Sequence, residues 1–564
     1  MTDQTSDPTP AVAADPDGDD PRADPDGDDP RADLRWGTIA NLVVDAVARG
    51  GDGEAMVDGD RTWTWSELGG EVGRATKAFI DAGIEVGDRV AIWAPNCAEW
   101  VVALLGLQSA GAVLVPLNTR FKGVEAADIL SRSRARILVT VDGFLGNRYV
   151  GMLDGFDLPH LERIVVLRSD QDDDLPAAAQ RWEDFLTSGE ASEVTDVLVA
   201  ARRAEVQPSS VADLLFTSGT TGKPKGVICA HEQTLRTVAT WANVVGLGPD
   251  DRYLAINPFF HSFGYKAGIV AWLATGGVLV PMGVFDVPEA MRLITEQRIS
   301  MVPGPPTLYQ TILNHPDRAQ LDSSSLRLAV TGAASVPVSL VEQMHTDLGF
   351  DTVITAYGLT EGCGFATMCR RSDSAETIAS TSGRAMPGIE VRIAGDDGDT
   401  LPAGEPGEVL VRGYNVMRGY FENPEATAEA IDGDGWLHTG DVGVMDERGY
   451  LRITDRIKDL FIVGGFNAYP AEIENLLLAH PDIAQVAVVG VPDERMGEVG
   501  AAFVVPTTAT TPDPDEILAW AREHMANYKA PRYVRIVDAL PFNPGGKVMK
   551  FVLRDQLAAE EAGT

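Results

Sequence analysis

Apolar and polar positions follow a regular pattern along most of the chain. From about residue 34 to residue 454, helical patterns alternate with short runs rich in Val, Ile and Leu. Such alternation predicts α/β layers around largely parallel sheets that are covered on both faces. The clearest predicted strands lie at 89–95, 136–140, 163–167, 299–304 and 326–332. We therefore expect an α/β fold with a large N-terminal domain of layered α/β subdomains.

Two long uncharged runs, at 100–118 and 267–285, raise the question of a membrane span. Each run has about the length of a spanning helix. Each is interrupted in the middle by a pair of small residues and then continues as Val-Leu-Val-Pro. This pattern predicts a buried helix, a tight turn and a short strand. We therefore expect two helix–strand units inside the α/β domain and no membrane span.

The pattern of apolar and polar residues changes twice toward the C-terminus. Between about 380 and 455 the chain becomes rich in glycine, with alternating strands at 388–395, 407–413 and 449–455. These predict a more antiparallel subdomain, a distorted or barrel-like sheet. The chain then starts afresh with a compact α+β unit, whose predicted elements are a helix at 470–480, strands at 483–492 and 500–506, and a helix at 514–525.

Charged residues interrupt two apolar strands between Asp455 and Lys458, so we place a domain boundary there. The predicted domains are 34–455 and a small mobile C-terminal domain, 456–564. At 564 residues the chain is too long for one ordinary core, which agrees with two domains. The net charge of −37 argues against a nucleic-acid partner and against anionic membranes.

Residues 1–33 form an acidic tail with eleven aspartates and two arginines. The unit Asp-Pro-Asp-Gly-Asp-Asp-Pro-Arg-Ala occurs at 15–23 and again at 24–32. Repeats of this composition bury too little apolar area to fold, so we expect a disordered tail without a catalytic part. It lacks the apolar stretch of a signal peptide and the basic residues of a transit peptide.

Cysteine and histidine spacing gives no sign of a metal site. The four cysteines have no Cys-x-x-Cys spacing, and the eight histidines are scattered. This usage predicts reduced thiols in a cytoplasmic protein rather than a disulfide framework or a zinc centre.

The stretch Thr-Ser-Gly-Thr-Thr-Gly-Lys-Pro-Lys-Gly, at 217–226, follows an apolar strand. Its glycines allow backbone N–H groups to converge on an anion, and its hydroxyls and lysines add donors. It is not a Walker A loop, because Pro224 stands where that motif has serine or threonine. A flexible surface hairpin is the structural alternative, but the composition favours a loop that binds the phosphates of ATP.

Four further segments carry groups suited to a nucleotide. Residues 355–361 combine an aromatic ring, a glycine turn, a hydroxyl and a carboxylate, and 436–441 end in a carboxylate. Residues 455–459 supply an arginine, and 543–547 present a lysine on a glycine loop. In this order, over roughly residues 35–555, the chain resembles the adenylate-forming superfamily of acyl-CoA synthetases, peptide-synthetase adenylation domains and luciferases.

The resemblance implies two half-reactions. A carboxylic acid and ATP give an acyl-adenylate and pyrophosphate, and the thiol of coenzyme A then displaces AMP. Charge builds on phosphate oxygens in the first step, so donors and a divalent cation must gather there. The resemblance assigns Mg²⁺ to Glu361 and Thr220, and the α-phosphate to Thr360. The residues expected to wrap the β- and γ-phosphates are Thr217, Ser218, Gly219, Thr220, Thr221, Gly222 and Lys223.

The resemblance also implies an adenosine site. Taken singly, each of its residues has a structural alternative, since a Tyr-Gly pair is often a turn and a lone aspartate is often a cap. Together they form a wall for adenine and acceptors for the ribose hydroxyls. The implied residues are Gly332, Ala333, Ala334, Tyr357 and Gly358 for adenine, with Asp441 and Arg456 for ribose.

The C-terminal domain is expected to act as a lid. Lys547 is implied to bridge the substrate carboxylate and the α-phosphate during adenylation. Lys458 resembles the hinge position of the family, although it could be an ordinary surface lysine. Rotation there would exchange Lys547 for the segment 464–470, with Gly464, Gly465 and Phe466, beside the coenzyme A channel.

The acid pocket is implied to lie between segments 257–268, 301–310 and 361–369. His261 is expected near the carboxylate, where it could gate entry of coenzyme A. These segments are apolar and contain no obvious partner for a second carboxylate, which favours a hydrophobic acid. The sequences at 258–269, 355–362 and 464–474 resemble those of the CoA ligases of actinobacterial steroid breakdown, which activate a bicyclic indanedione propanoate.

Three other functions remain open at this point. The chain could be a CoA ligase for medium- or long-chain fatty acids or for aryl acids. It could be an amino-acid adenylation domain, although no carrier segment follows Lys547. A nucleotide sensor without enzymatic activity fits poorly with the set Thr360, Glu361 and Lys547. In each case the expected partners are small molecules, and the family suggests a monomer or homodimer.

Overall fold

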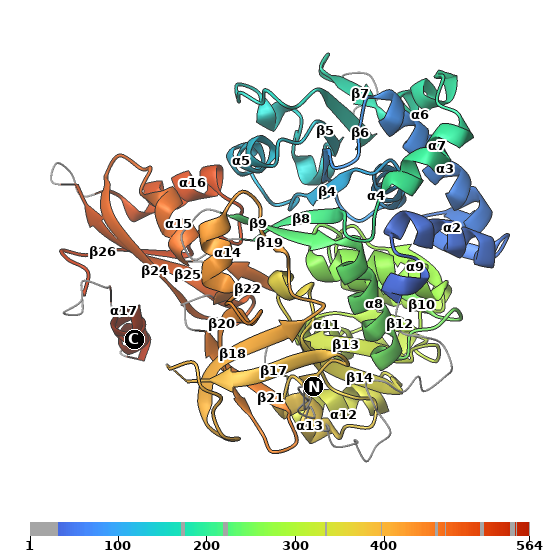
Figure 1. Ribbon diagram of the computed structural model, residues 1–564. Helices are drawn as coiled ribbons and strands as arrows, with labels where there is room; N and C mark the ends of the chain where they lie inside the picture. The colour runs from blue at the N-terminus through green and yellow to red at the C-terminus, as the bar shows by residue number, and fades with distance from the viewer. Residues whose placement is uncertain are drawn as a thin grey trace, which may run out of the picture.

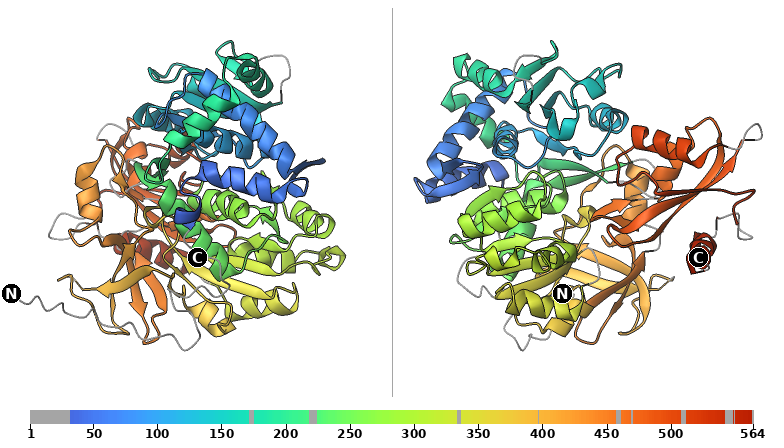
Figure 2. Two further views of the ribbon diagram at one scale, coloured as in Figure 1. Left: turned by 45° about the vertical axis from the view of Figure 1, so that its right-hand side comes forward. Right: turned by 180° about the vertical axis from the view of Figure 1, so that it is seen from behind.

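The computed structural model describes residues 32–170, 175–217, 224–332, 336–395, 397–456, 461–468, 470–507, 512–541, 548 and 550–562. Figure 1 shows a large body with a smaller C-terminal unit at its side. The right-hand view in Figure 2 shows the same unit, in orange-red to red, standing out from the body. No helix in these ranges is long and apolar enough to cross a membrane.

The first sheet of the large body has eight strands in the order β19-β9-β8-β4-β3-β5-β6-β7. The strands from β8 to β7 run parallel to one another. β9 pairs with β8 in antiparallel orientation, and the edge strand β19 pairs with β9 in antiparallel orientation. The bounds are β3 Arg89–Trp93, β4 Val113–Pro116, β5 Ile137–Asp142, β6 Arg163–Ser169, β7 Ala179–Arg181, β8 Val211–Thr217, β9 Lys225–Ala230 and β19 Gly419–Tyr420.

The second sheet has nine strands in the order β16-β15-β14-β13-β12-β10-β11-β1-β2. Strands β14 to β1 are parallel, and antiparallel strands close both edges. The bounds are β1 Glu54–Asp58, β2 Arg61–Thr64, β10 Arg252–Ala255, β11 Val278–Pro281, β12 Met301–Pro303, β13 Leu328–Gly332, β14 Thr352–Tyr357, β15 Thr367–Met368 and β16 Arg384–Ala385. The predicted parallel α/β layers are confirmed.

Helices cover these sheets and fill the space between them. α4 contacts β3 and β4 of the first sheet and β1 of the second, and nearly all of its residues are buried. Both uncharged runs form the predicted helix–turn–strand units, α4 with β4 and a π-helix over Gly264–Val270 that continues into α9 and β11. The helices of the body are α1 Ala32–Arg35, α2 Ile39–Gly50, α3 Trp65–Asp81, α4 Ala98–Ser109, α5 Gly123–Ser133, α6 Trp182–Ala191, α7 Asp196–Glu205, α8 His231–Val245, α9 Ala271–Thr275, α10 Val287–Glu296, α11 Pro306–Leu313, α12 Val338–Thr346, α13 Ala375–Ser380 and α14 Pro424–Ala430.

The glycine-rich region forms the predicted antiparallel sheet. Its strands are β17 Ile389–Ala394, β18 Pro406–Gly413, β20 Leu437–Met445 and β21 Leu451–Arg456, in the order β17-β18-β20-β21. This sheet shares the large hydrophobic core of the body through residues such as Val409, Val411 and Leu451. It therefore belongs to the same packed unit as the two parallel sheets.

The C-terminal unit has its own hydrophobic core, which runs from Phe461 to Leu557. Its sheet has the order β23-β22-β25-β24, and β26 pairs with β25 in parallel. The bounds are β22 Phe461–Val463, β23 Phe466–Ala468, α15 Pro470–Leu477, β24 Ile483–Asp493, β25 Gly497–Pro506, α16 Pro514–His524, β26 Tyr533–Ile536 and α17 Lys550–Ala562. The predicted α+β character is confirmed, while the boundary at 455/456 stays a prediction. The predicted tail lies almost wholly outside the described residues.

Candidate active site

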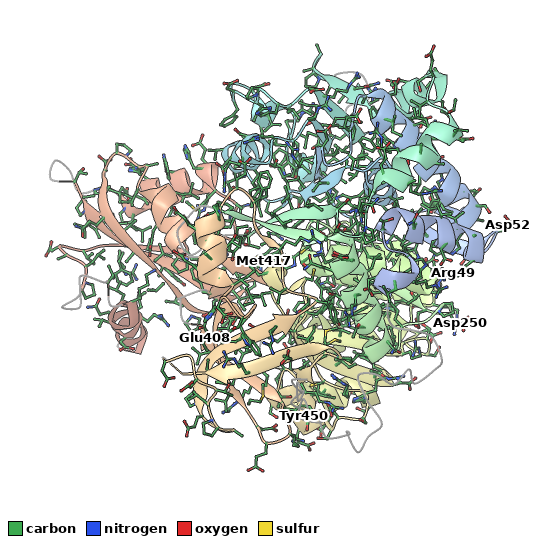
Figure 3. All side chains as sticks on the ribbon, viewed as in Figure 1. Arg49, Asp52, Asp250, Glu408, Met417 and Tyr450 are labelled. Carbon is green, nitrogen blue, oxygen red and sulfur yellow. The ribbon has the colours of Figure 1, made fainter. Side chains whose placement is uncertain are left out.

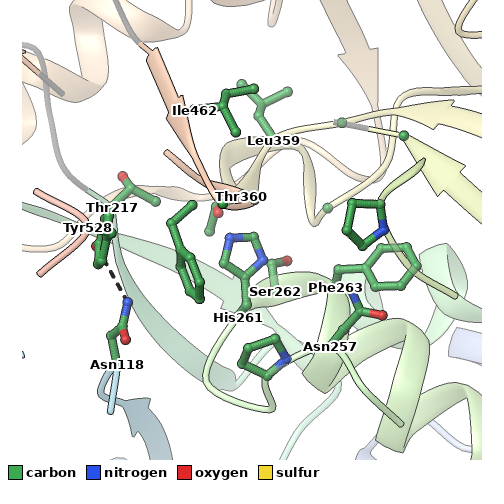
Figure 4. Close-up of a pocket in the computed structure, with 18 of the residues that line it drawn as sticks. Asn118, Thr217, Asn257, His261, Ser262, Phe263, Leu359, Thr360, Ile462 and Tyr528 are labelled. Atoms are coloured by element: carbon green, nitrogen blue, oxygen red, sulfur yellow. Dashed lines mark hydrogen bonds between the residues drawn. The ribbon is translucent and has the colours of Figure 1, made fainter. Parts of the chain in front are cut away.

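Strand ends from both large sheets surround one cavity of about 2710 Å³. Thr217 lies at the carboxyl end of β8, and Gly332 and Tyr357 lie at the ends of β13 and β14. Ligands in α/β folds bind at this edge of a parallel sheet. The C-terminal unit contributes residues 464–466 and 527–529 to the same lining. Figure 4 shows residues of the body and of this unit around the cavity.

Glu361 lies where three elements meet. The Oγ1 hydroxyl of Thr217 donates to Glu361 Oε1 at 3.2 Å, and the Tyr420 hydroxyl donates to the same oxygen at 3.0 Å. The Glu361 carbonyl accepts from the backbone N–H of Met417 at 2.8 Å, and the Met417 side chain is labelled in Figure 3. Neither hydroxyl uses Oε2. The end of the phosphate-loop strand and the predicted metal ligand are therefore hydrogen-bonded to each other.

Tyr357 and Asp441 form a second hydrogen-bonded pair at the cavity. The Tyr357 hydroxyl donates to Asp441 Oδ2 at 2.6 Å, and Asp441 is 4% exposed. The turn before Asp441 is held by Glu408, labelled in Figure 3, because its Oε1 accepts from the N–H of Gly440 at 3.0 Å. Asp441 faces Arg456 across β20 and β21. The predicted adenine and ribose residues thus lie at one place.

The backbone at Gly358 requires glycine. A Cβ atom there would lie 2.1 Å from the carbonyl oxygen of Gly364, a separation that real side chains do not show. The turn of Thr360 and Glu361 therefore folds back closely on the strand that carries Tyr357. This close approach brings the predicted α-phosphate and metal residues beside the adenosine pair.

His261 projects into the cavity from the loop that follows β10, and its side chain is exposed there. The surrounding protein shields the imidazole of His261 from bulk water. This desolvation lowers the pKa of His261 below its ordinary value and favours the neutral imidazole. Asn96 fixes the loop, because its Nδ2 donates to the carbonyls of Ala255 and Asn257 at 2.9 Å each. Its Oδ1 accepts from the Phe259 N–H at 2.8 Å.

The loop fixed by Asn96 continues into the π-helix through Gly264. A Cβ at Gly264 would lie 2.1 Å from the Pro258 carbonyl oxygen, so glycine is required. Phe263 and Phe365 then meet with ring centroids 5.7 Å apart, and Trp241 packs on both rings. These aromatic rings bring segments 257–268 and 361–369 together as the predicted acid wall.

A buried polar cluster lies on the far side of this wall. Lys266 is fully buried, with Nζ 3.5 Å from Asp213 Oδ1 and 3.5 Å from Cys363 Sγ. The thiols of Cys363 and Cys229 are 3.3 Å apart, and both are free. The cluster ties β8, β9, the π-helix and the turn after Glu361 together. Sequence reasoning missed it, because four isolated polar residues in apolar runs gave no signal of pairing.

The C-terminal unit touches the body through a small set of side chains. Gly464 and Gly465 have φ of 55° and 85° and form the two-residue turn between β22 and β23, which glycine favours. Phe466 follows this turn, stacks on Tyr528 at 5.0 Å and lies under the Arg120 guanidinium at 4.4 Å. Asn118 Nδ2 donates to the Tyr528 hydroxyl at 3.5 Å, drawn as a dashed line in Figure 4.

Lys529 joins the two units by buried charges. Its Nζ lies 2.7 Å from Glu125 Oε1 of the body and 2.6 Å from Glu472 Oε1 of the C-terminal unit. Burial alone would lower the pKa of Lys529, but Tyr528 and the two carboxylates raise it above its ordinary value. The lysine therefore stays charged at the junction. Nothing in the sequence indicated this triad, since its members are far apart along the chain.

The structure thus brings most of the described candidates to one cavity. The residues at the cavity are Thr217, His261, Gly332, Tyr357, Gly358, Thr360, Glu361, Asp441, Gly464, Gly465 and Phe466. The candidates outside the described residues are Ser218, Gly219, Thr220, Thr221, Gly222, Lys223, Ala333, Ala334, Lys458 and Lys547, and for Arg456 only the backbone is described.

Residues 43–421 match the AMP-binding enzyme family, and residues 472–547 match the AMP-binding enzyme C-terminal domain. The chain therefore belongs to the AMP-binding enzyme family. Within that family it is an AMP-forming acyl-CoA ligase, a class that uses ATP and coenzyme A.

Two curated relatives share about half of the sequence. A 3-(7a-methyl-1,5-dioxo-octahydro-1H-inden-4-yl)propanoyl:CoA ligase of Rhodococcus jostii is 50% identical over 90% of this chain and 96% of its own length. The enzyme of the same name from Mycobacterium tuberculosis is 52% identical over 89% of this chain and 96% of its own. A feruloyl-CoA synthase of Amycolatopsis is 36% identical over 89% of this chain and 95% of its own.

Solved structures share the fold. The amide bond synthetase McbA from Marinactinospora thermotolerans superposes with a TM-score of 0.78 at 30% identity, covering 92% of this chain and 99% of that one. A double mutant of the o-succinylbenzoate CoA synthetase MenE from Bacillus subtilis, bound to its product analogue OSB-NCoA, has a TM-score of 0.78 at 28% identity. The match covers 91% of this chain and 98% of that one. ATP-bound MatB from Rhodopseudomonas palustris has a TM-score of 0.62 at 28% identity, and the match covers 92% of this chain and 98% of that one.

Proposed function

We propose that this ligase activates a bicyclic acid with an indanedione ring system and a propanoate side chain. The observation that carries the proposal is the identity of 50% and 52%, over nearly the whole chain, with two ligases named for that acid. The feruloyl-CoA synthase and a long-chain fatty-acid ligase of Mycobacterium tuberculosis reach only 36% and 33%. The acid would come from the breakdown of a steroid ring system.

The acid wall supports this choice. Phe263 and Phe365 provide a broad aromatic surface, and Leu308 and Val330 add aliphatic area to the cavity lining. The described residues of segments 257–263, 304–308 and 363–365 include no lysine or arginine. A monocarboxylic acid with a compact hydrophobic ring system suits such a wall. A diacid would leave its second carboxylate without a charged partner.

For the nucleotide, we infer that the hydrogen-bonded pairs already in place mark the binding positions. Asp441 accepts from the ribose hydroxyls, with Arg456 beside it, and adenine lies against Tyr357. Thr217, with the loop up to Lys223, surrounds the outer phosphates, and Thr360 donates to the α-phosphate. Donors placed before the reaction stabilise charge as it develops on the phosphate oxygens.

Mg²⁺ fits this arrangement. It prefers hard oxygen ligands, and Glu361 offers carboxylate oxygen Oε2, which neither neighbouring hydroxyl uses. Glu361 would hold the ion, together with Thr220 from the phosphate loop. When bound, the ion would neutralise charge on the phosphates. The hydroxyls of Thr217 and Tyr420 fix the carboxylate in place for this task.

The position of the C-terminal unit suits the thioester-forming step. The turn of Gly464 and Gly465 and the ring of Phe466 line the same cavity as His261, where coenzyme A would enter. For adenylation, the unit would rotate about Lys458 and bring Lys547 to the carboxylate and the α-phosphate.

Pyrophosphate release from the purified full chain tests the proposal. ATP and Mg²⁺ are supplied with an indanedione propanoate, octanoate, palmitate or ferulate, each with and without coenzyme A. We expect the indanedione acid to give the highest kcat/KM and to yield its CoA thioester only when coenzyme A is present. A higher kcat/KM for a fatty acid or for ferulate would overturn the substrate proposal. A set with an amine in place of coenzyme A checks for the amide chemistry named for McbA.

A further inference from the structure

Among the described residues, four side-chain oxygens of the cavity lining are buried and lack a hydrogen-bond partner. They are Ser262 Oγ, Thr331 Oγ1, Asn257 Oδ1 and Glu472 Oε2, and the last belongs to the carboxylate already paired with Lys529. Ser262 and Thr331 are each only 3% exposed. Buried polar groups without partners are uncommon in native proteins, because each one loses its bonds to water and gains none in return. Such groups on the wall of a binding cavity indicate that a ligand supplies the missing bond.

Ser262 belongs to the acid wall and lines the cavity. It lies between His261 and Phe263 in sequence, and Figure 4 shows it beside the His261 ring. Its Oγ lies against Gly364, where an added Cβ would be 3.0 Å away, so no side chain shields it from that direction. Ser262 is therefore a hydroxyl donor that lies between His261 and the aromatic side chain of Phe263 in the acid wall.

Thr331 presents a second hydroxyl from a different element. It is the penultimate residue of β13 and lies opposite Thr355 of β14. Thr355 contrasts with it, because the Thr355 hydroxyl already donates to the Ile378 carbonyl at 2.9 Å. Thr331 has no such bond within the described chain. The carboxyl end of β13 thus carries a hydroxyl that has no acceptor among the described residues.

We propose that the hydroxyls of Ser262 and Thr331 are specificity-determining groups that donate hydrogen bonds to the ring ketones of the acid. This inference rests on the proposed function. The ligases of known name act on an acid with two oxo groups, at ring positions 1 and 5, and ketones accept hydrogen bonds but cannot donate them. Two orphan donors on an apolar wall match that pattern. Asn257 Oδ1 is an acceptor and has no counterpart on a ketone.

The proposed contacts need only a change of side-chain torsion. Serine and threonine hydroxyls turn toward a new acceptor by moving between staggered rotamers of χ1. Both residues already line the cavity, so no backbone movement is required. A hydrocarbon acid of the same size would leave both donors unpaired. The wall would then select an oxygenated ring system over a purely hydrocarbon one.

The test crosses enzyme variants with matched acids. Ser262→Ala and Thr331→Val remove one hydroxyl each and nearly preserve shape. The acids are the indanedione propanoate, its two mono-ketones and the saturated hydrocarbon analogue. We expect each variant to lose about 3- to 10-fold in kcat/KM for the diketone and to change less than about twofold for the hydrocarbon acid. Each variant should also become indifferent to the removal of one particular ketone.

Thr311→Val is the matched control. Thr311 also lines the cavity, but its hydroxyl already donates to the Thr307 carbonyl at 2.7 Å. Its ratio of kcat/KM between diketone and hydrocarbon acids should equal that of the wild type. Equal losses for both acids in Ser262→Ala or Thr331→Val would show a structural role and overturn the proposal. An unchanged ratio in both variants would also overturn it.

The wild-type enzyme separates this inference from the function on which it rests. If the wild type prefers the diketone acid over fatty acids and the variants keep that preference, only the role of the hydroxyls fails. If the wild type prefers fatty acids, the substrate proposal itself fails. If a variant does not fold, the dissociation constants of the diketone acid and the hydrocarbon acid are measured with the wild-type enzyme, and their ratio tests the proposal. Equal constants would overturn the proposal, and tighter binding of the diketone would support it.

Discussion

The two sides of the cavity are held together in different ways. On the nucleotide side, hydrogen bonds join Thr217, Tyr420 and Glu361, and Tyr357 with Asp441, and all five residues belong to the large body. On the lid side, the contacts of Asn118, Arg120 and Glu125 cross from the body to a unit with its own core. One side is fixed by folding, and the other by docking.

This difference has a functional meaning. The nucleotide groups can wait in position, because no domain movement is needed to align them. In the proposed two-step cycle the C-terminal unit presents different faces in the two half-reactions, so its docking contacts would have to break and re-form. Two of the three contacts that cross the junction are weak: a cation over a ring and one long hydrogen bond. The buried charges around Lys529 are the exception, because each loses its water on docking.

The largest effect is expected from Lys529→Met. The change leaves Glu472 and Glu125 buried without a cation, and removing one partner of a buried pair costs about 3–5 kcal/mol. We expect faster amide hydrogen exchange in β24 and β25 and a slower thioester-forming step. Burial raises the pKa of Glu472 above its ordinary value. The defect should therefore be largest at high pH and shrink as the pH falls through that raised pKa.

Glu125→Gln is the matched variant for the docking part. It removes only the negative charge across the junction and leaves the bond of 2.6 Å between Lys529 and Glu472 inside the C-terminal unit. Thioester formation should slow while amide exchange within the lid stays near the wild-type rate. If Lys529→Met and Glu125→Gln changed amide hydrogen exchange in the C-terminal unit equally, its stability would not depend on the bond between Lys529 and Glu472. The distinction between internal and docking contacts would then be wrong.

Lys547→Ala should come next in size. Loss of a cation aimed at the developing charge is expected to slow adenylation by about 10²–10³-fold. Conversion of preformed acyl-adenylate to the thioester should suffer far less, because the lid would then show its other face. Single-turnover measurements of the two half-reactions separate these effects.

Lys550→Ala is the control for Lys547→Ala. Lys550 is three residues further along and lines the same cavity, but its Nζ is paired with Glu474 Oε1 at 2.7 Å. Adenylation by this variant should stay within about twofold of the wild type, as for a partly exposed ion pair. Equal damage to both half-reactions in Lys547→Ala would remove the assigned role.

Local pattern predicted much of this architecture. The run 100–118 has glycine between an apolar helix pattern and Val-Leu-Val-Pro, and it forms α4 and β4 as expected. Alternation over 388–413 predicted the antiparallel pair β17 and β18. In both cases neighbouring residues carry the information, because helix and strand periods repeat within a few positions.

Long-range partners could not be predicted in the same way. Lys529 and Glu125 are 404 positions apart, and a lysine in the segment 525–532 looks like any surface residue. Asn96 holds the His261 loop through backbone contacts, and sequence spacing carries no mark of them. The motifs marked the cavity residues as a set, whereas the side chains that orient them became visible only in the folded chain.

The smallest effects are expected from Asp441→Asn and Tyr357→Phe, on the side of the cavity fixed by folding. The carboxylate becomes a neutral acceptor of the same shape, and hydrogen bonds to ionised groups are about twice as strong as neutral ones. ATP affinity should fall about 3- to 10-fold, or about 1 kcal/mol. Tyr357→Phe keeps the carboxylate and removes only the 2.6 Å bond that orients it, so its loss should be smaller. Equilibrium binding of ATP measures both, and neither variant should alter amide exchange in the lid, because both residues belong to the body. A larger loss for Tyr357→Phe than for Asp441→Asn would mean that the ring, rather than the charge, dominates this half of the site.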